Sequence, residues 1–212
     1  MGDHASPAMA QPAAGGGGGA PPRIAIATGN PGKLREYREL LAGEGLQVEA
    51  VDTSVREDGT TYEANAALKA AAASAATGLW ALGDDTGLEV EALDGWPGLR
   101  SARVATTQED RNRLLFERLA GVPRPWRARF VCGLALAAPG RPMRTFLGCR
   151  DGEVVEPRAG AGGFGYDAVF LVPELGRTFT ELSPAEKHAT SHRGAAVRAL
   201  LASGALAELA GR

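Results

Sequence analysis

The chain has 212 residues, 44% of them hydrophobic, and a formal net charge of -2. This length and hydrophobicity suit one compact domain with its own core, or two small lobes. The near-zero charge argues against a nucleic-acid partner held by bulk positive charge. No apolar stretch approaches the roughly 20 residues needed to cross a bilayer, so no membrane partner is expected either.

The first 22 residues, MGDHASPAMAQPAAGGGGGAPP, are rich in alanine, glycine and proline. They lack the basic start and apolar centre of a secretory signal, and they can bury too little surface to order themselves. We therefore expect residues 1–22 to form a disordered tail and residues 23–212 to form a single domain. Two cysteines without a signal indicate a reducing compartment, so Cys132 and Cys149 are predicted to be free thiols in the cytoplasm.

The first elements follow a strand–helix–strand–helix order. A strand at 24–27 leads through the turn ATGNPGK into a helix with one apolar face, and LQVEAV predicts a second strand. TTYEANAALKAAAASAATG predicts a strong helix that ends at Gly78. Asp58 or Thr60 is expected to cap the start of that helix.

The stretch GLWALGDDTGLEV places two aspartates between apolar runs. LWALGDD and LEVEAL are interpreted as two strands around an aspartate turn. Because consecutive side chains of a strand point to opposite faces, Asp84 and Asp85 can reach one site only if the strand has ended. One aspartate is therefore expected to brace the turn, and the other to serve chemistry.

The second half adds a helix at TQEDRNRLLFERLAG, a long hairpin at 127–156 and a closing helix at SHRGAAVRALLASGALAEL. A hairpin turn centred on Gly140 and Arg141 would place Cys132 directly opposite Cys149. Parallel and antiparallel features are mixed, so the sequence predicts the α/β class with a mixed sheet.

The turn ATGNPGK is typical of an anion site, because the N–H groups and dipole at a helix start favour negative charge. Thr28 and Asn30 can donate hydrogen bonds there, and Lys33 adds a positive charge. The spacing is not that of a P-loop, and an ordinary turn is the alternative. Only three of the 23 basic residues are lysines, Lys33, Lys69 and Lys187. This rarity suggests positions that require a compact ammonium, and chance retention on the surface is the alternative.

Two further stretches carry candidate binding residues. In GAGGFGYDAVF, Phe164 and Tyr166 could stack on a nucleobase or simply close the core. In SPAEKHATSHRG, Ser183 and Glu186 form a capping box, and Arg193 begins the next helix, where a cation opposes the dipole unless a negative group is bound. The carboxylates of REDG, ahead of the 60–78 helix, suggest Mg²⁺.

Taken in order, the chain resembles the inosine triphosphate pyrophosphatase family through ATGNPGK, EDGTTYEANAALKA, GDDTGLEVEALDGWPGLRSAR, GGFGYDAVF and ELSPAEKHATSHRGAA. These stretches span residues 24 to about 200 and contain all three lysines. The resemblance implies a twisted mixed sheet with flanking helices, two lobes around a central cleft, and a homodimer. It also implies Mg²⁺-dependent hydrolysis of ITP, dITP and XTP to the monophosphate and pyrophosphate.

The resemblance assigns Asp85, Lys33 and Lys69 to catalysis, and Asp85 and Glu57 to the metal. The implied substrate-binding residues are Thr28, Gly29, Asn30, Pro31, Gly32, Lys33, Thr86, Phe164, Gly165, Tyr166, Asp167, Lys187, His192 and Arg193. Asp85 is expected to face the cleft, with Asp84 on the other side of the turn. Two alternatives stay open: a pyrophosphatase for pyrimidine or modified nucleotides, and a nucleotide-binding sensor without turnover.

Overall fold

A single mixed sheet organises the molecule. The computed structural model describes residues 20–160 and 162–209, whose strands form one seven-stranded sheet in the order β2-β1-β3-β4-β5-β6-β7. The strands are β1 (Arg23–Ala27), β2 (Gln47–Val51), β3 (Trp80–Val90), β4 (Trp126–Ala137), β5 (Arg144–Val154), β6 (Phe170–Val172) and β7 (Arg177–Thr178). β1 is parallel to both β2 and β3, and every later pairing is antiparallel. The predicted α/β class with a mixed sheet is confirmed.

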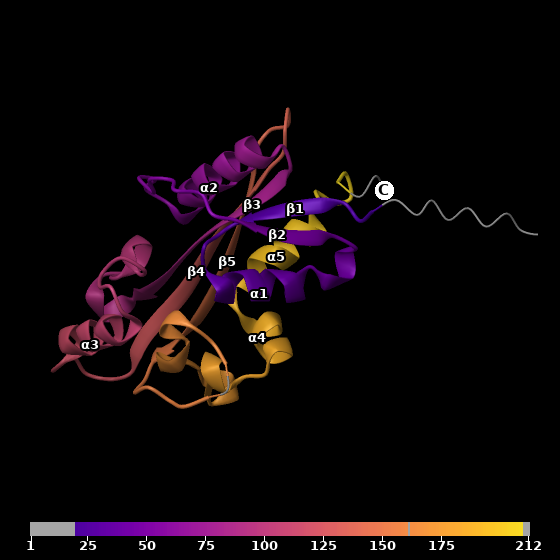
Figure 1. Ribbon diagram of the computed structural model, residues 1–212. Helices are drawn as coiled ribbons and strands as arrows, with labels where there is room; N and C mark the ends of the chain where they lie inside the picture. The colour runs from indigo at the N-terminus through magenta and orange to yellow at the C-terminus, as the bar shows by residue number, and fades with distance from the viewer. Residues whose placement is uncertain (1–19, 161, 210–212) are drawn as a thin grey trace, which may run out of the picture.

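Helices cover both faces of this sheet. They are α1 (Pro31–Leu40), α2 (Tyr62–Thr77), α3 (Gln108–Leu119), α4 (Pro184–Thr190) and α5 (His192–Ala202). Short 3₁₀ segments lie between them: η1 (Ala42–Glu44), η2 (Glu91–Leu93), η3 (Gly98–Arg100), η4 (Gly165–Val169), η5 (Pro173–Leu175) and η6 (Phe179–Glu181). Figure 1 shows α2 on one face of the sheet and α1 and α5 on the other.

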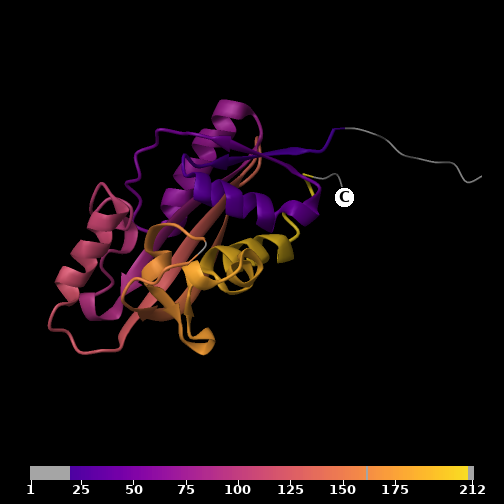
Figure 2. The ribbon, with the colours of Figure 1, turned by 60° about the horizontal axis from the view of Figure 1, so that its bottom comes forward.

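Two apolar cores lie at opposite ends of the long strands β3, β4 and β5, and they define two lobes. One core packs α1 and α5 against Ile26, Leu82 and Leu134. The other packs α3 and the segment after β5 against Leu88 and Phe130. Figure 2 shows α3 and that later segment at one end of the long strands, with β1, β2 and α1 at the other end. Asp84 and Asp85 therefore lie on β3 between Leu82 in one core and Leu88 in the other.

Glycines let two helices approach the sheet closely. A Cβ on Gly133 of β4 would lie 2.4 Å from the carbonyl carbon of Tyr62, at the start of α2. A Cβ on Gly148 of β5 would lie 2.1 Å from the backbone oxygen of His192, at the start of α5. Contacts this short leave no room for any side chain. The first turns of α2 and α5 are thereby fixed against the two faces of the sheet.

The aspartate pair does not lie in a turn, so that prediction is wrong. β3 runs without a break from Trp80 to Val90, and each of its residues from Ala81 to Val90 pairs with β4. Pairing with β4 satisfies the backbone groups that an aspartate turn would otherwise have used. The alternation of side chains therefore persists through Asp84 and Asp85, which point to opposite faces of the sheet.

The predicted hairpin forms, but its register differs from the expected one by one residue. Cys132 pairs with Gly148, and Cys149 pairs with Val131. A shift of one residue moves a side chain to the other face, so the two thiols lie on opposite faces, one buried and one exposed. Both are free, as predicted.

Two helix boundaries also differ from the predictions. Thr61, rather than Asp58 or Thr60, caps α2, because its hydroxyl accepts the Ala64 N–H at 3.1 Å. α5 ends at Ala202 instead of continuing to residue 209, since Gly204 adopts a left-handed φ of 70°. α2 ends at Gly78, also left-handed, as predicted, and the capping box of Ser183 and Glu186 is present.

The predicted disordered tail falls largely on residues outside those that the structure describes. Among residues 20–160 and 162–209, the structure contains no helix that combines the length and the apolar character of a membrane span.

Candidate active site

A cavity of about 530 Å³ lies between the two lobes. It collects most of the residues expected from the sequence: Thr28, Gly29, Asn30, Lys33, Glu57, Lys69, Asp85, Thr86, Phe164, Gly165, Tyr166, Asp167, His192 and Arg193. Pro31, Gly32 and Lys187 do not line it. Five cations and five carboxylates are among the lining residues, so charges of both signs meet in a small volume.

The loop between β1 and α1 presents side chains, more than backbone amides, to the cavity. The side-chain oxygen Oδ1 of Asn30 accepts the N–H groups of Gly32 at 2.8 Å and Lys33 at 3.2 Å, which caps α1. These two backbone amides already have hydrogen-bond partners, whereas the predicted anion site needs backbone amides that are free to bind the anion. The Asn30 amide NH₂, the Thr28 hydroxyl and the Lys33 ammonium are the donors that this loop turns toward a ligand.

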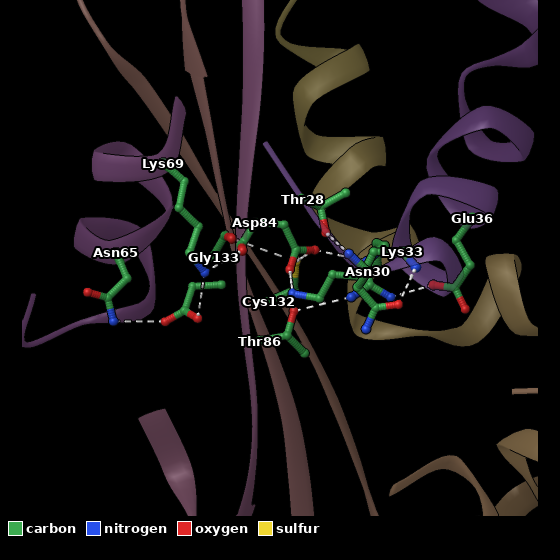
Figure 3. A network of polar contacts seen from close by, with 12 residues as sticks. Thr28, Asn30, Lys33, Glu36, Asn65, Lys69, Asp84, Thr86, Cys132 and Gly133 are labelled. Atoms are coloured by element: carbon green, nitrogen blue, oxygen red, sulfur yellow. Dashed lines mark hydrogen bonds and ion pairs between the residues drawn. The ribbon is translucent and has the colours of Figure 1, made fainter. Parts of the chain in front are cut away.

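Asp84 is the centre of a buried network on the α1 and α5 side of the sheet (Figure 3). Its Oδ2 accepts hydrogen bonds from Tyr37 Oη at 2.7 Å, Arg193 Nε at 2.9 Å and Cys132 Sγ at 3.4 Å. Its Oδ1 accepts from Thr86 Oγ1 at 2.8 Å and from the Lys33 ammonium. Burial raises the pKa of Asp84, but the charges of Arg193 and Lys33 outweigh burial and hold it well below its usual value.

Glu36 of α1 extends this network toward the other lobe. It accepts hydrogen bonds from Arg193 and from Lys187 Nζ, the latter at 2.6 Å. Lys187 also donates to Asp167 Oδ2 at 2.6 Å, and the same oxygen accepts the Phe164 N–H at 2.7 Å. Lys187 thus stands behind the cavity wall and joins α1 to the 164–167 loop. The Arg193 cation at the start of α5 is balanced by Asp84 and Glu36.

Asp85 faces α2, on the other side of β3. Its carboxylate accepts a hydrogen bond from Asn65 Nδ2 at 2.9 Å and contacts Lys69 Nζ at 3.3 Å. Lys69 also pairs with Glu57 at 2.8 Å. Burial lowers the pKa of Lys69, but Asp85 and Glu57 outweigh it, so the net shift is upward and Lys69 stays an ammonium. Asp85 is held by far fewer groups than Asp84.

Asp85 and Glu57 are the residues suited to a hard cation. Both carboxylates converge on the same nitrogen, Lys69 Nζ, so a positive group already occupies the space between them. Glu57 is ionised, since hydrogen bonds from Lys69 and Arg103 outweigh burial and lower its pKa. Within the described residues, no group of three or more metal-binding side chains forms by itself. Two carboxylates are, however, what Mg²⁺ commonly takes from a protein when phosphates complete its coordination.

Aromatic rings form the wall nearest the 164–167 loop. His192 stacks on Phe130 with ring centroids 4.5 Å apart. Burial, reinforced by Arg193, holds the pKa of His192 well below its usual value, so its ring is neutral. Tyr166 is buried in the core of the same lobe and donates to the Ser101 carbonyl at 3.3 Å. Phe164 lies against Gly32, where a Cβ would be 2.6 Å from its Cδ1 atom. Tyr166 thus fits the core alternative while still lining the cavity.

Sequence reasoning missed several lining residues. The sequence patterns place Asp84 in a turn and do not point to Asp52, Arg103, Gln108 or Arg111, although all five line the cavity. Arg103 lies inside the quoted stretch that ends in SAR, so the signal was present there. Asp52 follows β2 and the other two lie on α3, and only the tertiary fold brings these segments to the cavity.

Comparisons with known proteins cover the same region. The profile of the Ham1 family matches residues 24–203. A dITP/XTP pyrophosphatase of Gloeobacter violaceus is 49% identical over 180 residues, which cover 84% of this chain and 92% of that protein. One from Thermus thermophilus is 47% identical over 186 residues, covering 84% and 90%.

Solved structures agree with this similarity. A HAM1 protein from Coxiella burnetii matches with a TM-score of 0.75 at 38% identity, covering 88% of this chain and 98% of that one. The Ham1 protein of Staphylococcus aureus matches with a TM-score of 0.73 at 36% identity, covering 85% and 96%. The similarity in sequence and in fold extends over both lobes that line the cavity.

Proposed function

The chain belongs to the Ham1 family, and on that premise we propose that it hydrolyses non-canonical purine nucleoside triphosphates such as ITP, dITP and XTP. The products are the nucleoside monophosphate and pyrophosphate. Its relatives in Gloeobacter violaceus and Thermus thermophilus are named dITP/XTP pyrophosphatases. Removal of such nucleotides before polymerases use them is the corresponding cellular role.

The observation that carries this proposal is the position of Asp85 in the same cavity as Thr28, Asn30 and Lys33. The latter three turn donors toward the ligand, which suits the oxygens of a triphosphate. Asp85 supplies a carboxylate from the neighbouring strand. A general base and a phosphate-binding loop in one cavity are what attack of water on a phosphorus requires.

Asp85 is the general base in this proposal. Its two hydrogen bonds, from Asn65 and Lys69, fix its orientation and leave part of its acceptor capacity free. It can therefore accept a proton from a water molecule that attacks the α-phosphorus, and pyrophosphate then leaves. Lys69 keeps the carboxylate in place, and Lys33 holds the phosphates with the donors that Asp84 leaves available.

Mg²⁺ is the proposed cofactor, and Asp85 and Glu57 are the side chains that would hold it. A bound Mg²⁺ neutralises phosphate charge and favours attack at phosphorus. Both carboxylates form ion pairs with Lys69, so the Lys69 ammonium compensates their negative charges.

Selection of the base is assigned to the wall around Phe164 and Arg193. Phe164 offers a flat apolar face. Arg193 is donor-only, and it suits the 6-oxygen of hypoxanthine and xanthine better than the 6-amino group of adenine. Asp84 and Glu36 fix its guanidinium, so its direction is set before the nucleotide binds.

Two further expectations remain proposals. The homodimer is implied by the family resemblance, and the cytoplasmic location follows from two cysteines without a secretory signal. The size of the particle in solution, measured by light scattering, tests the first. Fractionation of the cells that make the protein tests the second.

A nucleotide panel tests the proposed function. The protein is incubated with Mg²⁺ and ITP, dITP, XTP, GTP, ATP, CTP or UTP, and pyrophosphate and orthophosphate are measured separately. We expect pyrophosphate from ITP, dITP and XTP far faster than from the others. Preferential turnover of pyrimidine nucleotides would support the first alternative, and binding without any product would support a sensor. Asp151→Asn, on the exposed part of β5, is the matched control for Asp85→Asn.

A further inference from the structure

Arg111 of α3 differs from the other cations of the cavity. Each of the others has a carboxylate partner: Lys33 pairs with Asp84, Lys69 with Glu57 and Asp85, Arg103 with Glu57, and Arg193 with Asp84 and Glu36. Among the described residues, Arg111 forms hydrogen bonds only with neutral acceptors. Within residues 20–160 and 162–209, no carboxylate therefore forms an ion pair with Arg111, although Arg111 lines the cavity.

Those neutral acceptors fix the guanidinium. Nε donates to the Ala105 carbonyl at 2.9 Å, and Nη2 donates to the Thr106 carbonyl at 3.3 Å. Nη1 donates to Gln108 Oε1 at 3.4 Å, and the Gln108 amide is itself oriented by Asn112 at 2.9 Å. Three of the five N–H groups of a guanidinium are thus used. Two donors remain for a ligand.

Arg111 lies beside the loop assigned to the base. Gln108 Oε1 is 4.0 Å from the position that a Cβ on Gly165 would take. Burial raises the pKa of Tyr166 to about 12, and the nearby charge of Arg111 opposes that rise. The hydrogen bonds of Arg111 all reach residues 105–108 and none reaches the 28–33 loop. Its closeness to Gly165 and Tyr166 therefore places Arg111 on the side of the cavity assigned to the base.

We propose that Arg111 is a specificity-determining residue that reads position 2 of the purine, an inference that rests on the proposed function. Xanthine carries an oxygen at position 2, which can accept hydrogen bonds from a donor-only guanidinium. Hypoxanthine carries only a hydrogen there. Guanine carries an amino group, a donor, so a donor would face a donor.

Arg193 alone cannot distinguish GTP from ITP and XTP. GTP shares the 6-oxygen of ITP and XTP, so a donor at position 6 accepts all three bases. A second fixed donor at position 2 favours XTP, tolerates ITP and disfavours GTP, because two donors that face each other cannot form a hydrogen bond and a polar group left without a partner is costly. Sites built to form hydrogen bonds discriminate far more strongly than apolar pockets do.

The test is Arg111→Met, with Arg113→Met as its control. Arg113 lies on the same helix but is exposed and pairs with Asp110 and Glu117. We expect kcat/KM for XTP divided by that for GTP to fall by about tenfold or more in Arg111→Met. The ITP/ATP ratio should stay unchanged, and Arg113→Met should change neither ratio. An equal loss on XTP, ITP and GTP, or no change in the XTP/GTP ratio, would overturn the proposal.

A second variant guards against a folding defect. Arg111→Lys keeps a donor-only cation and is expected to retain most of the XTP/GTP ratio. If Arg111→Met and Arg111→Lys lower the XTP/GTP ratio of kcat/KM equally, shape rather than hydrogen-bond donation selects the base, and the proposal is wrong. A wild-type protein that releases no pyrophosphate from XTP or ITP contradicts the proposed function instead, so the two failures are distinct.

Discussion

Two neighbouring aspartates on opposite faces of β3 differ in how many hydrogen bonds their carboxylates accept. Asp84 accepts five hydrogen bonds from α1, α5 and the sheet, which saturates a carboxylate. Asp85, one residue later, accepts two from α2. In Figure 3, Asn65 and Lys69 lie on one side of the strand, and Asn30, Lys33 and Glu36 lie on the other.

This difference separates two roles within one strand. A saturated, buried carboxylate with a strongly lowered pKa is a poor proton acceptor, but it can hold Lys33 and Arg193 in fixed positions. A carboxylate with free acceptor capacity can bind water or metal. We infer that Asp84 positions the binding groups and Asp85 performs chemistry. Strand alternation is what allows two adjacent carboxylates to do this without repelling each other across one site.

The largest expected effect is on the Asp85 face. Asp85→Asn keeps the shape of the side chain but removes a base and a good ligand for hard cations. We expect kcat on ITP to fall by about 10²–10⁴-fold. The melting temperature should stay close to that of wild type, as circular dichroism would show. Turnover within a factor of a few of wild type would remove Asp85 from the mechanism.

On the opposite face, the loss should appear as stability. Asp84→Asn leaves Lys33 and Arg193 with one buried carboxylate fewer, and breaking a buried ion pair from one side costs about 3–5 kcal/mol. Urea unfolding followed by tryptophan fluorescence would measure this. A change below about 1 kcal/mol, the size expected for a surface pair, would show that the network does not support the fold.

Acid should weaken the network on the Asp84 face through Glu36. Burial raises the pKa of Glu36, but Arg193 and Lys187 outweigh it and hold the pKa at about 2, below the usual 4.5. A lowered pKa adds stability that is fully present above pH 4.5 and is lost as the pH falls toward 2. By linkage this amounts to roughly 3 kcal/mol.

The matching variant is Glu36→Gln, which lacks this titration. Its unfolding free energy should therefore decrease less between pH 5 and pH 3 than that of wild type, measured by urea unfolding at each pH. Parallel curves for the two proteins would contradict the assignment to Glu36.

Two glycines allow each face to be disturbed separately. Gly133→Ala would push the start of α2 away from Asp85, and Gly148→Ala would push the start of α5 away from Asp84. Overpacking of this kind typically costs about 1–3 kcal/mol. We expect Gly133→Ala to lower kcat and Gly148→Ala to raise KM, because α5 carries Arg193. The reverse pattern in steady-state kinetics would mean that the two helices have been assigned to the wrong steps.

The smallest effect is expected at Lys33. Lys33→Arg keeps the charge but replaces the compact ammonium that pairs with Asp84 by a broad planar group. A loss of about 1.4 kcal/mol in transition-state binding, or tenfold in kcat/KM, is expected. Arg35→Lys on the same helix, outside the cavity, is the control. Wild-type kinetics in Lys33→Arg would refute the argument from lysine rarity.

The sequence predicted local structure well where local chemistry decided it. The end of α2 at Gly78 follows from the left-handed conformation that glycine accepts, and the capping box at Ser183 needs only two nearby side chains. β3 was predicted to break at the aspartates because Gly-Asp-Asp is a local turn signal. Pairing with β4, far away in the chain, overrode that signal.

The site was predictable to a similar depth. The three lysines were singled out by their rarity, and all three form buried or half-buried ion pairs in the structure. Glu36 and Arg111 were missed, because one carboxylate or arginine on an amphipathic helix does not stand out from its neighbours. The role of Glu36 depends on partners more than 50 residues away in the chain. The role of Arg111 depends on its position in the cavity wall.

The most direct test of the two roles is the rate of pyrophosphate release in a single turnover of ITP, per folded molecule, for Asp84→Asn and Asp85→Asn side by side. Correcting for the folded fraction removes the stability loss expected for Asp84→Asn. We expect Asp84→Asn then to release pyrophosphate about tenfold or more faster than Asp85→Asn. A corrected rate for Asp84→Asn equal to or below that of Asp85→Asn would contradict it.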